Sequence, residues 1–219
     1  MLIKRSYLSE IIDDFSITDE RIDQALIELR VINRYLGGNS TSMSGIKTAV
    51  SVTQTPEKLK ILDLGAGASE LFDNTDCVSI DLNIEACRFD RKNNPSKKIV
   101  CCDAFMLPFK PGSFQIVHAS LFLHHFREDE IVRLINNISS ITQHAIIIND
   151  LRRSVFAFLG IKLLTFLFSG SEMVKNDGPL SVKRGFVKKE LQEIISHLNF
   201  KTVIIKRKWA FRWMVSCLK

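Results

Sequence analysis

The stretch K-I-L-D-L-G-A-G-A-S-E-L, residues 60–71, decides the fold of this 219-residue chain. Its first part, Ile61–Leu64, has the apolar bias of a short buried strand, and Gly65-Ala66-Gly67 follows directly. A glycine turn at the end of a strand lets the backbone approach a ligand where a Cβ atom would collide with it. The pattern therefore predicts a ligand site at the end of this strand.

Two later stretches, Cys77–Asp81 and Ile99–Asp103, also have strand character, and each ends in an aspartate. A carboxylate at the end of the second strand is suited to bind the two hydroxyls of a ribose. Strands that alternate with helices favour a parallel sheet with right-handed crossovers. The glycine turn and the two acids, each at a strand end, together predict a nucleoside pocket.

The residue at position 70 helps to choose the nucleoside. A dinucleotide motif would place its third glycine there, but Glu70 puts an anion close to where a pyrophosphate would lie. The chain also has no G-x-x-x-x-G-K-[ST] phosphate loop. A cofactor with adenine and ribose but no phosphate fits better, and S-adenosyl-L-methionine is the obvious one.

With these residues the chain resembles the class I S-adenosylmethionine-dependent methyltransferases. The resemblance rests on an ordered set of stretches between Ile61 and Asp150: I-L-D-L-G-A-G, V-S-I-D-L-N, C-D-A-F-M-L-P-F and S-F-Q-I-V-H-A-S-L-F-L-H-H-F. It implies a Rossmann-like α/β fold, with a seven-stranded, mostly parallel sheet, a terminal antiparallel hairpin and helices on both faces. The alternative is that the glycines make a tight turn in an unrelated α/β domain.

The resemblance also implies which residues bind the cofactor. Asp81 would hold the ribose hydroxyls, Asp103 would lie at the adenine edge, and Ser120 would flank the methionine and its methyl group. The interval from Asp63 to Asp81 is shorter than is usual in the family, so we expect a clipped first crossover helix from Ala68. The full implied cofactor set is Asp63, Gly65, Ala66, Gly67, Asp81, Leu82, Asp103, Ala104, Ser120 and Leu121.

Three residues are candidates for catalysis. Methyl transfer needs chiefly alignment, and a base helps when the acceptor is a phenol, whose pKa is about 10. His124 and His125 follow the fourth strand and can accept a proton at neutral pH, although they can equally orient the loop or touch the cofactor. Asp150 is an alternative base or the cap of the next helix. His118, inside the strand, reads as a core histidine with satisfied partners.

Length and composition predict a single globular unit. The resemblance implies that residues 1–55 form an N-terminal helical cap and residues 56–219 the methyltransferase domain. Of the residues, 46% are apolar and 25% charged, which argues against disorder. Five cysteines without C-x-x-C spacing suggest reduced thiols and no metal site. The N-terminal residues lack an apolar run, so we expect no secretory signal and a cytoplasmic protein.

The remaining elements are predicted from apolar spacing and turn signals. We expect an amphipathic helix that is capped at Thr18-Asp19-Glu20 and ends at Gly37-Gly38. Further along the chain we expect a polar loop (Asn39–Ser44), a short helix (Gly45–Ser51), a fourth strand (Phe114–Ala119), a helix (Glu128–Ile141), a fifth strand (Ala145–Ile148), a turn (Asp177–Ser181), a helix (Lys188–His197) and two final strands (Lys201–Lys206 and Trp213–Leu218).

One segment, Val155–Phe168, is apolar along almost its whole length. It is shorter than the ~20 residues that span a bilayer, and Lys162 interrupts it, so a transmembrane helix is not expected. Three interpretations stay open: a core helix, a wall of a lipophilic acceptor pocket, or a helix in peripheral contact with the inner face of a membrane.

The formal charge of +6 is concentrated after Lys183. Such a basic region can attract RNA or another anionic surface, but we favour a solvated face. Amino-methylating enzymes of nucleic acids often carry N-P-P-[YFW] after the fourth strand, whereas Ser120-Leu121-Phe122 stands here. A nucleic-acid partner is therefore not expected.

Three further stretches, R-Y-L-G-G, N-D-L-R-R-S and D-G-P-L-S-V-K-R-G-F, look like a narrower group. They resemble small bacterial methyltransferases of polyketide-type and other lipophilic metabolites. This resemblance implies O-methylation of a small lipophilic hydroxylated acceptor. The alternatives are a C-methyltransferase of a quinone precursor, an RNA methyltransferase, and an inactive cofactor-binding subunit of a complex.

Overall fold

A computed structural model describes residues 4–54, 59–67, 70–72 and 75–219. Within them one seven-stranded sheet runs in the order β3-β2-β1-β4-β5-β7-β6. Strands β1 to β5 pair in parallel, and β7 runs antiparallel to both β5 and β6. The strands are β1 (Lys60–Leu64), β2 (Asp76–Asp81), β3 (Lys98–Cys101), β4 (Phe114–Ser120), β5 (Thr142–Leu151), β6 (Thr202–Lys208) and β7 (Arg212–Leu218).

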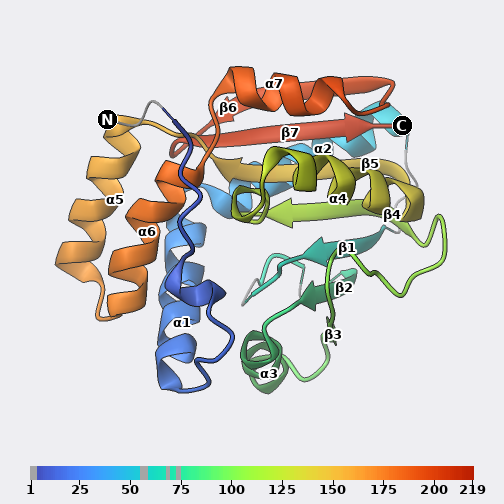
Figure 1. The fold of residues 1–219 in the computed structure, drawn as a ribbon. Helices are drawn as coiled ribbons and strands as arrows, with labels where there is room; N and C mark the ends of the chain where they lie inside the picture. Colours follow the sequence, from blue (N-terminus) through green and yellow to red (C-terminus); the bar gives the residue numbers. More distant parts are fainter. Residues whose placement is uncertain (1–3, 55–58, 68–69, 73–74) are drawn as a thin grey trace.

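Helices cover both faces of the sheet (Figure 1). On one face, Leu62 and Leu64 of β1 share a core with α4 and α7; on the other, Ile61 packs with Ile46 and Ala49 of α2. This alternation follows from the two-residue period of a strand. The helices are α1 (Glu20–Tyr35), α2 (Gly38–Thr53), α3 (Ile84–Asn93), α4 (Glu128–Ile141), α5 (Val155–Phe168), α6 (Glu172–Arg184) and α7 (Lys188–Ser196), with 3-10 turns η1 (Ile11–Asp13) and η2 (Leu123–His125).

The sequence-based fold class is confirmed. The α/β sheet, its terminal antiparallel hairpin and the position of α4 agree with the predicted elements. In α4 the buried residues Ile131, Leu134, Ile135 and Ile138 recur at helical spacing, and burying each stabilises the fold by about 1.5–3 kcal/mol. The predicted clipped helix from Ala68 begins outside the described residues.

The carboxyl ends of the parallel strands meet at one edge, at the left of Figure 1. There α1, α6 and the N-terminal segment (residues 4–17) lie across the ends of the strands. An open parallel sheet binds ligands in the crevice at this edge. The fold therefore brings the predicted strand-end residues and the N-terminal segment to the same place.

The polar loop predicted for Asn39–Ser44 is wrong, because α2 runs without interruption from Gly38 to Thr53. Two polar side chains of this stretch face the interior of the protein. Thr41 and Ser42 are buried, and the Ser42 hydroxyl hydrogen-bonds within the core of the sheet. Polar residues on an inward helix face carry the same sequence signal as a loop.

The turn predicted for Asp177–Ser181 is also wrong, since these residues lie inside α6. The Asp177 carboxylate accepts hydrogen bonds from the backbone amides of Ile11 and Ile12, at 2.8 and 2.9 Å. Asp177 thus ties the N-terminal segment to α6, and this tertiary role outweighs the local turn propensity of Gly178-Pro179.

Helix α5 does not belong to the core. Only Ala157 and Thr165 of its residues are buried, whereas Phe156, Phe166 and Phe168 are each at least 75% exposed. The core-helix interpretation is therefore wrong. No helix in the described ranges combines the length and the apolar content needed to cross a bilayer.

Candidate active site

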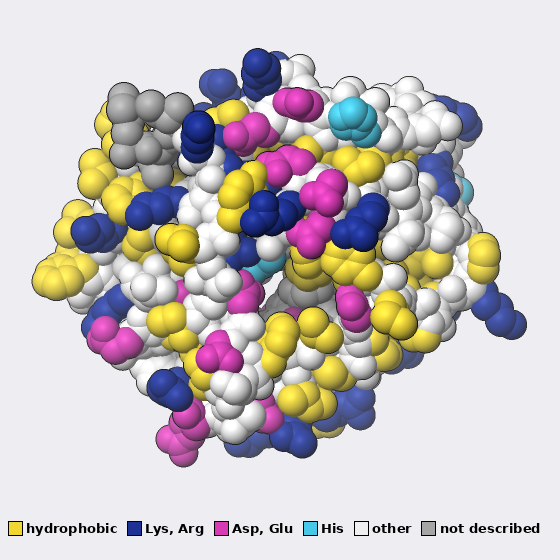
Figure 2. All heavy atoms as spheres, in the orientation of Figure 1, with side chains coloured by type: hydrophobic (Ala, Val, Ile, Leu, Met, Phe, Trp, Pro, Cys, Tyr) yellow, Lys and Arg dark blue, Asp and Glu magenta, His cyan; other side chains and the backbone are white. Residues whose placement is uncertain are grey.

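A cavity of about 450 Å³ opens at the carboxyl edge of β1, β2 and β4. His124 and His125 line it, and Asp150 does not. The face seen in Figure 2 is hollowed near its middle. The structure brings the whole cofactor set implied by the resemblance into this lining, namely Asp63, Gly65, Ala66, Gly67, Asp81, Leu82, Asp103, Ala104, Ser120 and Leu121.

The glycine turn after β1 has a geometry that side chains do not tolerate. Gly65 adopts φ of 57°, and a Cβ atom on it would lie 2.3 Å from the ring of Phe122. Gly67 adopts φ of 52°, and its backbone amide donates a hydrogen bond to Oδ2 of Asp81 at 2.9 Å. The turn therefore closes onto the end of β2 and leaves backbone facing the cavity.

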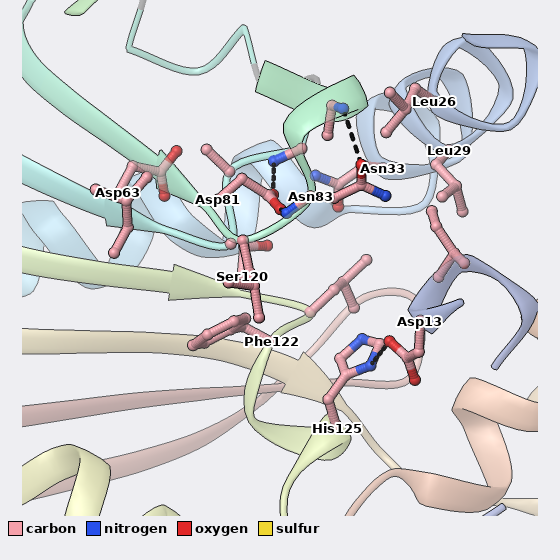
Figure 3. A pocket seen from close by; sticks show the side chains of 18 of the residues that line it. Asp13, Leu26, Leu29, Asn33, Asp63, Asp81, Asn83, Ser120, Phe122 and His125 are labelled. Atoms are coloured by element: carbon pink, nitrogen blue, oxygen red, sulfur yellow. Dashed lines mark hydrogen bonds and ion pairs between the residues drawn. The ribbon is translucent and has the colours of Figure 1, made fainter. Parts of the chain in front are cut away.

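Asp81 is held at the end of β2 by two backbone amides. Its Oδ1 accepts from Asn83 at 2.9 Å, and its Oδ2 accepts from Gly67. Burial raises the pKa of the Asp81 carboxyl above its ordinary value, although these two amide donors oppose the shift. Figure 3 shows Asp81 and Asn83 together on one side of the cavity.

Asp63 belongs to a buried hydrogen-bonded chain that begins at the cavity wall. Its Oδ1 lies 2.7 Å from Nδ1 of His118, whose Nε2 lies 2.8 Å from the Ser42 hydroxyl. The Asn149 amide donates to the hydroxyls of Ser42 and Ser120, at 2.9 and 3.0 Å. His118 is thus a core histidine with satisfied partners, as expected, and the chain fixes Ser120 at the cavity wall.

Glu70, the unexpected anion of the glycine stretch, pairs with helix α1. Its carboxylate lies 2.7 Å from Nη1 of Arg30 and 3.3 Å from Nη2 of Arg34. These ion pairs balance the charge of Glu70 and hold α1 beside the cavity, where Leu26 and Asn33 also line the wall.

His124 lies at the inner end of the cavity against Asp150. Its Nδ1 lies 2.7 Å from Oδ1 of Asp150, and both side chains are almost fully buried. Burial opposes protonation of His124, but the carboxylates of Asp150 and Glu10 outweigh it and raise its pKa to about 9. The capping interpretation of Asp150 is wrong, because Ser154 is the N-cap of α5 and Asp150 is bound to His124.

His125 faces the cavity and contacts the N-terminal segment. Its Nδ1 lies 2.9 Å from Oδ1 of Asp13, as Figure 3 shows. Burial raises the pKa of Asp13, but His125 and Arg184 lower it more, to about 2. Arg184 donates to the backbone oxygens of His124 and His125, at 3.1 and 2.8 Å, and so fixes both histidines.

Residues 62–145 match the family model described as a methyltransferase domain. This segment of the chain is similar to that family. The resemblance stated from the sequence motifs is confirmed for this segment.

Solved structures with the same fold are also methyltransferases. The plantazolicin methyltransferase BpumL, in complex with SAH, superposes with a TM-score of 0.67 at 14% identity, covering 95% of this chain and 98% of that one. Magnesium protoporphyrin IX methyltransferase from Synechocystis PCC 6803, with bound SAM, gives 0.59 at 12% identity, covering 97% and 100%. At these identities the likeness concerns the fold. No curated protein sequence matches the chain.

Sequence reasoning missed the site residues that come from the N-terminal segment and from α1. Glu10 and Asp13 reach the histidines from the N-terminal segment, and Arg30 and Arg34 reach Glu70 from α1. No local pattern marks these residues. Glu70 could have indicated the two arginines, because a carboxylate beside a ligand site is usually balanced by a cationic side chain.

Proposed function

We propose that this chain is an S-adenosylmethionine-dependent methyltransferase that methylates an oxygen of a small lipophilic hydroxylated molecule. One observation carries the proposal: ten residues implied by the sequence motifs, from four different strand ends, line a single cavity. The methyltransferase-domain match and the shared fold support the reaction class.

In this proposal the adenosyl group lies along the ends of β2 and β3. Asp81 takes the ribose hydroxyls, Asp103 and Ala104 lie at the adenine edge, and the glycine turn meets the methionine part. Ser120 and Leu121 then flank the methyl group and direct it toward His124 and His125. Both histidines line the cavity, so the acceptor oxygen would lie between them and the sulfonium.

The rest of the cavity suits a lipophilic acceptor. Its further lining includes a group of apolar residues from the N-terminal segment, α1, the loop after β4 and the end of β5: Ile12, Phe15, Leu29, Phe122, Phe126 and Leu151. Apolar walls with a few polar groups are typical of small-molecule sites. The two named structural neighbours are called methyltransferases of a magnesium porphyrin and of plantazolicin, and neither name refers to a nucleic acid.

We further propose that α5 rests on an anionic membrane surface, from which the acceptor is collected. None of its residues lines the cavity, and it is not a core helix. Its exposed apolar residues form a patch at the left edge of Figure 2, in a helix without acidic residues and with Lys162 exposed. Lys183 lies beside it, 5.0 Å from the ring of Phe158. Apolar area flanked by cations favours interfacial binding to anionic lipids.

The change Phe166→Asp tests this contact. Phe166 is 75% exposed, so folding should be unaffected, while partition into phosphatidylglycerol vesicles should fall about tenfold or more. Cosedimentation with vesicles measures it. Val52→Asp on α2, an exposed apolar residue of another helix, is the matched control and should partition as the wild type does. Equal partition of both variants and the wild type would refute the membrane contact.

Methyl transfer itself is tested with S-adenosylmethionine labelled in its methyl group. The purified chain is incubated with cofactor and with lipid, RNA and protein fractions from cells, and label is counted in each. We expect label in the organic phase, in an ether that resists mild alkaline hydrolysis and releases iodomethane on cleavage with hydriodic acid. Label on carbon would favour the quinone-precursor alternative, label in RNA would overturn the acceptor class, and cofactor binding without transfer would indicate an inactive subunit.

A further inference from the structure

We propose that Glu10, His124 and His125 form a binding site for a divalent transition-metal cation, with Zn²⁺ as the best match. The site lies in the wall of the cavity, where the N-terminal segment meets the turn η2. One donor atom from each of the three residues lies within 4.8 Å of the other two. The site itself does not depend on the proposed methyl transfer.

Two of the donor atoms are buried and point at each other. Oε1 of Glu10 and Nε2 of His124 lie 3.6 Å apart, and among the described residues neither has a hydrogen-bond partner. Two ligands of a tetrahedral zinc ion, each about 2.1 Å from the metal, are about 3.4 Å apart. A buried polar atom without a partner costs free energy, and a cation between the two atoms would remove that cost.

His124 is oriented as metal-ligating histidines usually are, and His125 has a carboxylate close to its ring. Nδ1 of His124 lies 2.7 Å from Asp150, and Nδ1 of His125 lies 2.9 Å from Asp13. Nδ1 of His124 hydrogen-bonds to Asp150, which leaves the Nε2 lone pair of this ring for a cation, whereas Nδ1 of His125 lies at ion-pair distance from Asp13 without a hydrogen bond among the described residues. A carboxylate behind each ligating histidine fixes the ring and raises its basicity.

The charges around the site favour a dication. Glu10, Asp13 and Asp150 supply three carboxylates and Arg184 supplies one guanidinium, while Arg5, which donates to the backbone oxygen of His124, is balanced by Glu128. Arg184 lies 3.0 Å from Asp13 and 3.7 Å from Glu10, and its other donors bind backbone oxygens. With neutral histidines two negative charges remain, and one divalent cation would balance them.

The donor set selects the kind of metal. Two imidazoles and one carboxylate suit Zn²⁺, Fe²⁺ or Mn²⁺, whereas Mg²⁺ and Ca²⁺ prefer oxygen ligands. Three protein ligands leave a coordination position open, as in catalytic zinc sites. All three residues line the cavity, so a ligand in the cavity could take that position.

The use of the open position rests on the proposed function. An acceptor hydroxyl bound there would lose its proton to water at a lower pH than in solution. Its oxygen would then attack the methyl carbon as the sulfonium S–C bond breaks, which releases neutral S-adenosylhomocysteine and the methyl ether. In this arrangement the cation takes the place of a general base.

Zinc binding is measured on the metal-stripped chain without cofactor or acceptor, so its outcome is independent of methyl transfer. We expect one Zn²⁺ per chain by calorimetry and by elemental analysis after gel filtration. Glu10→Gln and His125→Asn should each weaken binding about 100-fold or more. Asp150→Asn, which acts through His124, should weaken it about 10–100-fold.

The matched control is His197→Asn, which removes an exposed histidine after α7 and should bind Zn²⁺ as the wild type does. Thermal unfolding of each metal-free variant identifies any that fail to fold, and Glu10→Gln and His125→Asn change different elements. Folded Glu10→Gln and His125→Asn variants that bind Zn²⁺ like the wild type would overturn the site. A wild-type chain that retains less than one Zn²⁺ through gel filtration would overturn it as well.

Discussion

Asp81→Ala should weaken S-adenosylmethionine binding by a factor on the order of 100 or more. In the proposed complex the Asp81 carboxylate accepts hydrogen bonds from both ribose hydroxyls. Hydrogen bonds to a charged group contribute about 1.5–3 kcal/mol each, so the loss of two corresponds to at least a hundredfold in affinity. Isothermal calorimetry with S-adenosylmethionine and S-adenosylhomocysteine measures the effect.

Two controls separate the ribose contact from the local structure. Asp81 also accepts from the amides of Gly67 and Asn83, so thermal unfolding must accompany the titration. Asp81→Asn keeps an acceptor oxygen of the same shape and should lose less affinity than Asp81→Ala. Asp129→Ala, at an exposed position of α4, should bind as the wild type does. A folded Asp81→Ala variant with wild-type affinity would contradict the proposed cofactor position.

His118→Leu should lower the free energy of unfolding by about 3–5 kcal/mol. Asp63 is 2% exposed, and Nδ1 of His118 is its hydrogen-bond partner, so the change leaves a buried carboxyl group unpaired. It also removes the partner of the Ser42 hydroxyl. Urea denaturation followed by circular dichroism measures the loss.

A double change tests whether the pair itself is responsible. Asp63→Leu combined with His118→Leu removes both buried polar groups, so it should be less destabilising than the sum of the two single changes. His197→Leu, at an exposed histidine, should stay within about 0.5 kcal/mol of the wild type. If His118→Leu were as stable as His197→Leu, the buried chain from Asp63 to Asn149 would not stabilise the fold as described.

The cofactor side of the cavity could be predicted because its residues follow strand ends. Asp63, Asp81 and Ser120 lie in strands whose apolar pattern is local, and parallel strands bring their carboxyl ends to one edge by topology. The local residue pattern and the topology of a parallel sheet were therefore sufficient to predict that these residues lie in one site. The same reasoning placed His124 and His125 at the cavity.

The other side of the cavity could not be predicted, because it depends on tertiary pairing. Asp13 meets His125 across more than a hundred residues, and Asp177 fixes that contact by binding the amides of Ile11 and Ile12. Neither acid has a local signature. Ser42 was assigned to a loop for a related reason, since a polar residue that bonds inside the core resembles one that faces water.

For Asp150 and α5 the sequence left several interpretations open, and the burial of their side chains in the structure decides between them. Asp150 is 1% exposed and lies behind His124, so it orients this histidine rather than facing the cavity. Helix α5 was as compatible with the core as with a surface, because an apolar stretch of its length has no period that tells the two apart. Its exposure excludes the core, and its absence from the lining excludes the pocket wall.

The central claim is that the cavity at the ends of β1, β2 and β4 holds an adenosyl group. A crystal structure with S-adenosylhomocysteine tests it most directly. We predict both ribose hydroxyls within 3.2 Å of the Asp81 carboxylate, a distance on the order of an ordinary hydrogen bond, and the sulfur facing His125. Electron density for the ligand outside this cavity, or a ribose that does not reach Asp81, would contradict the account.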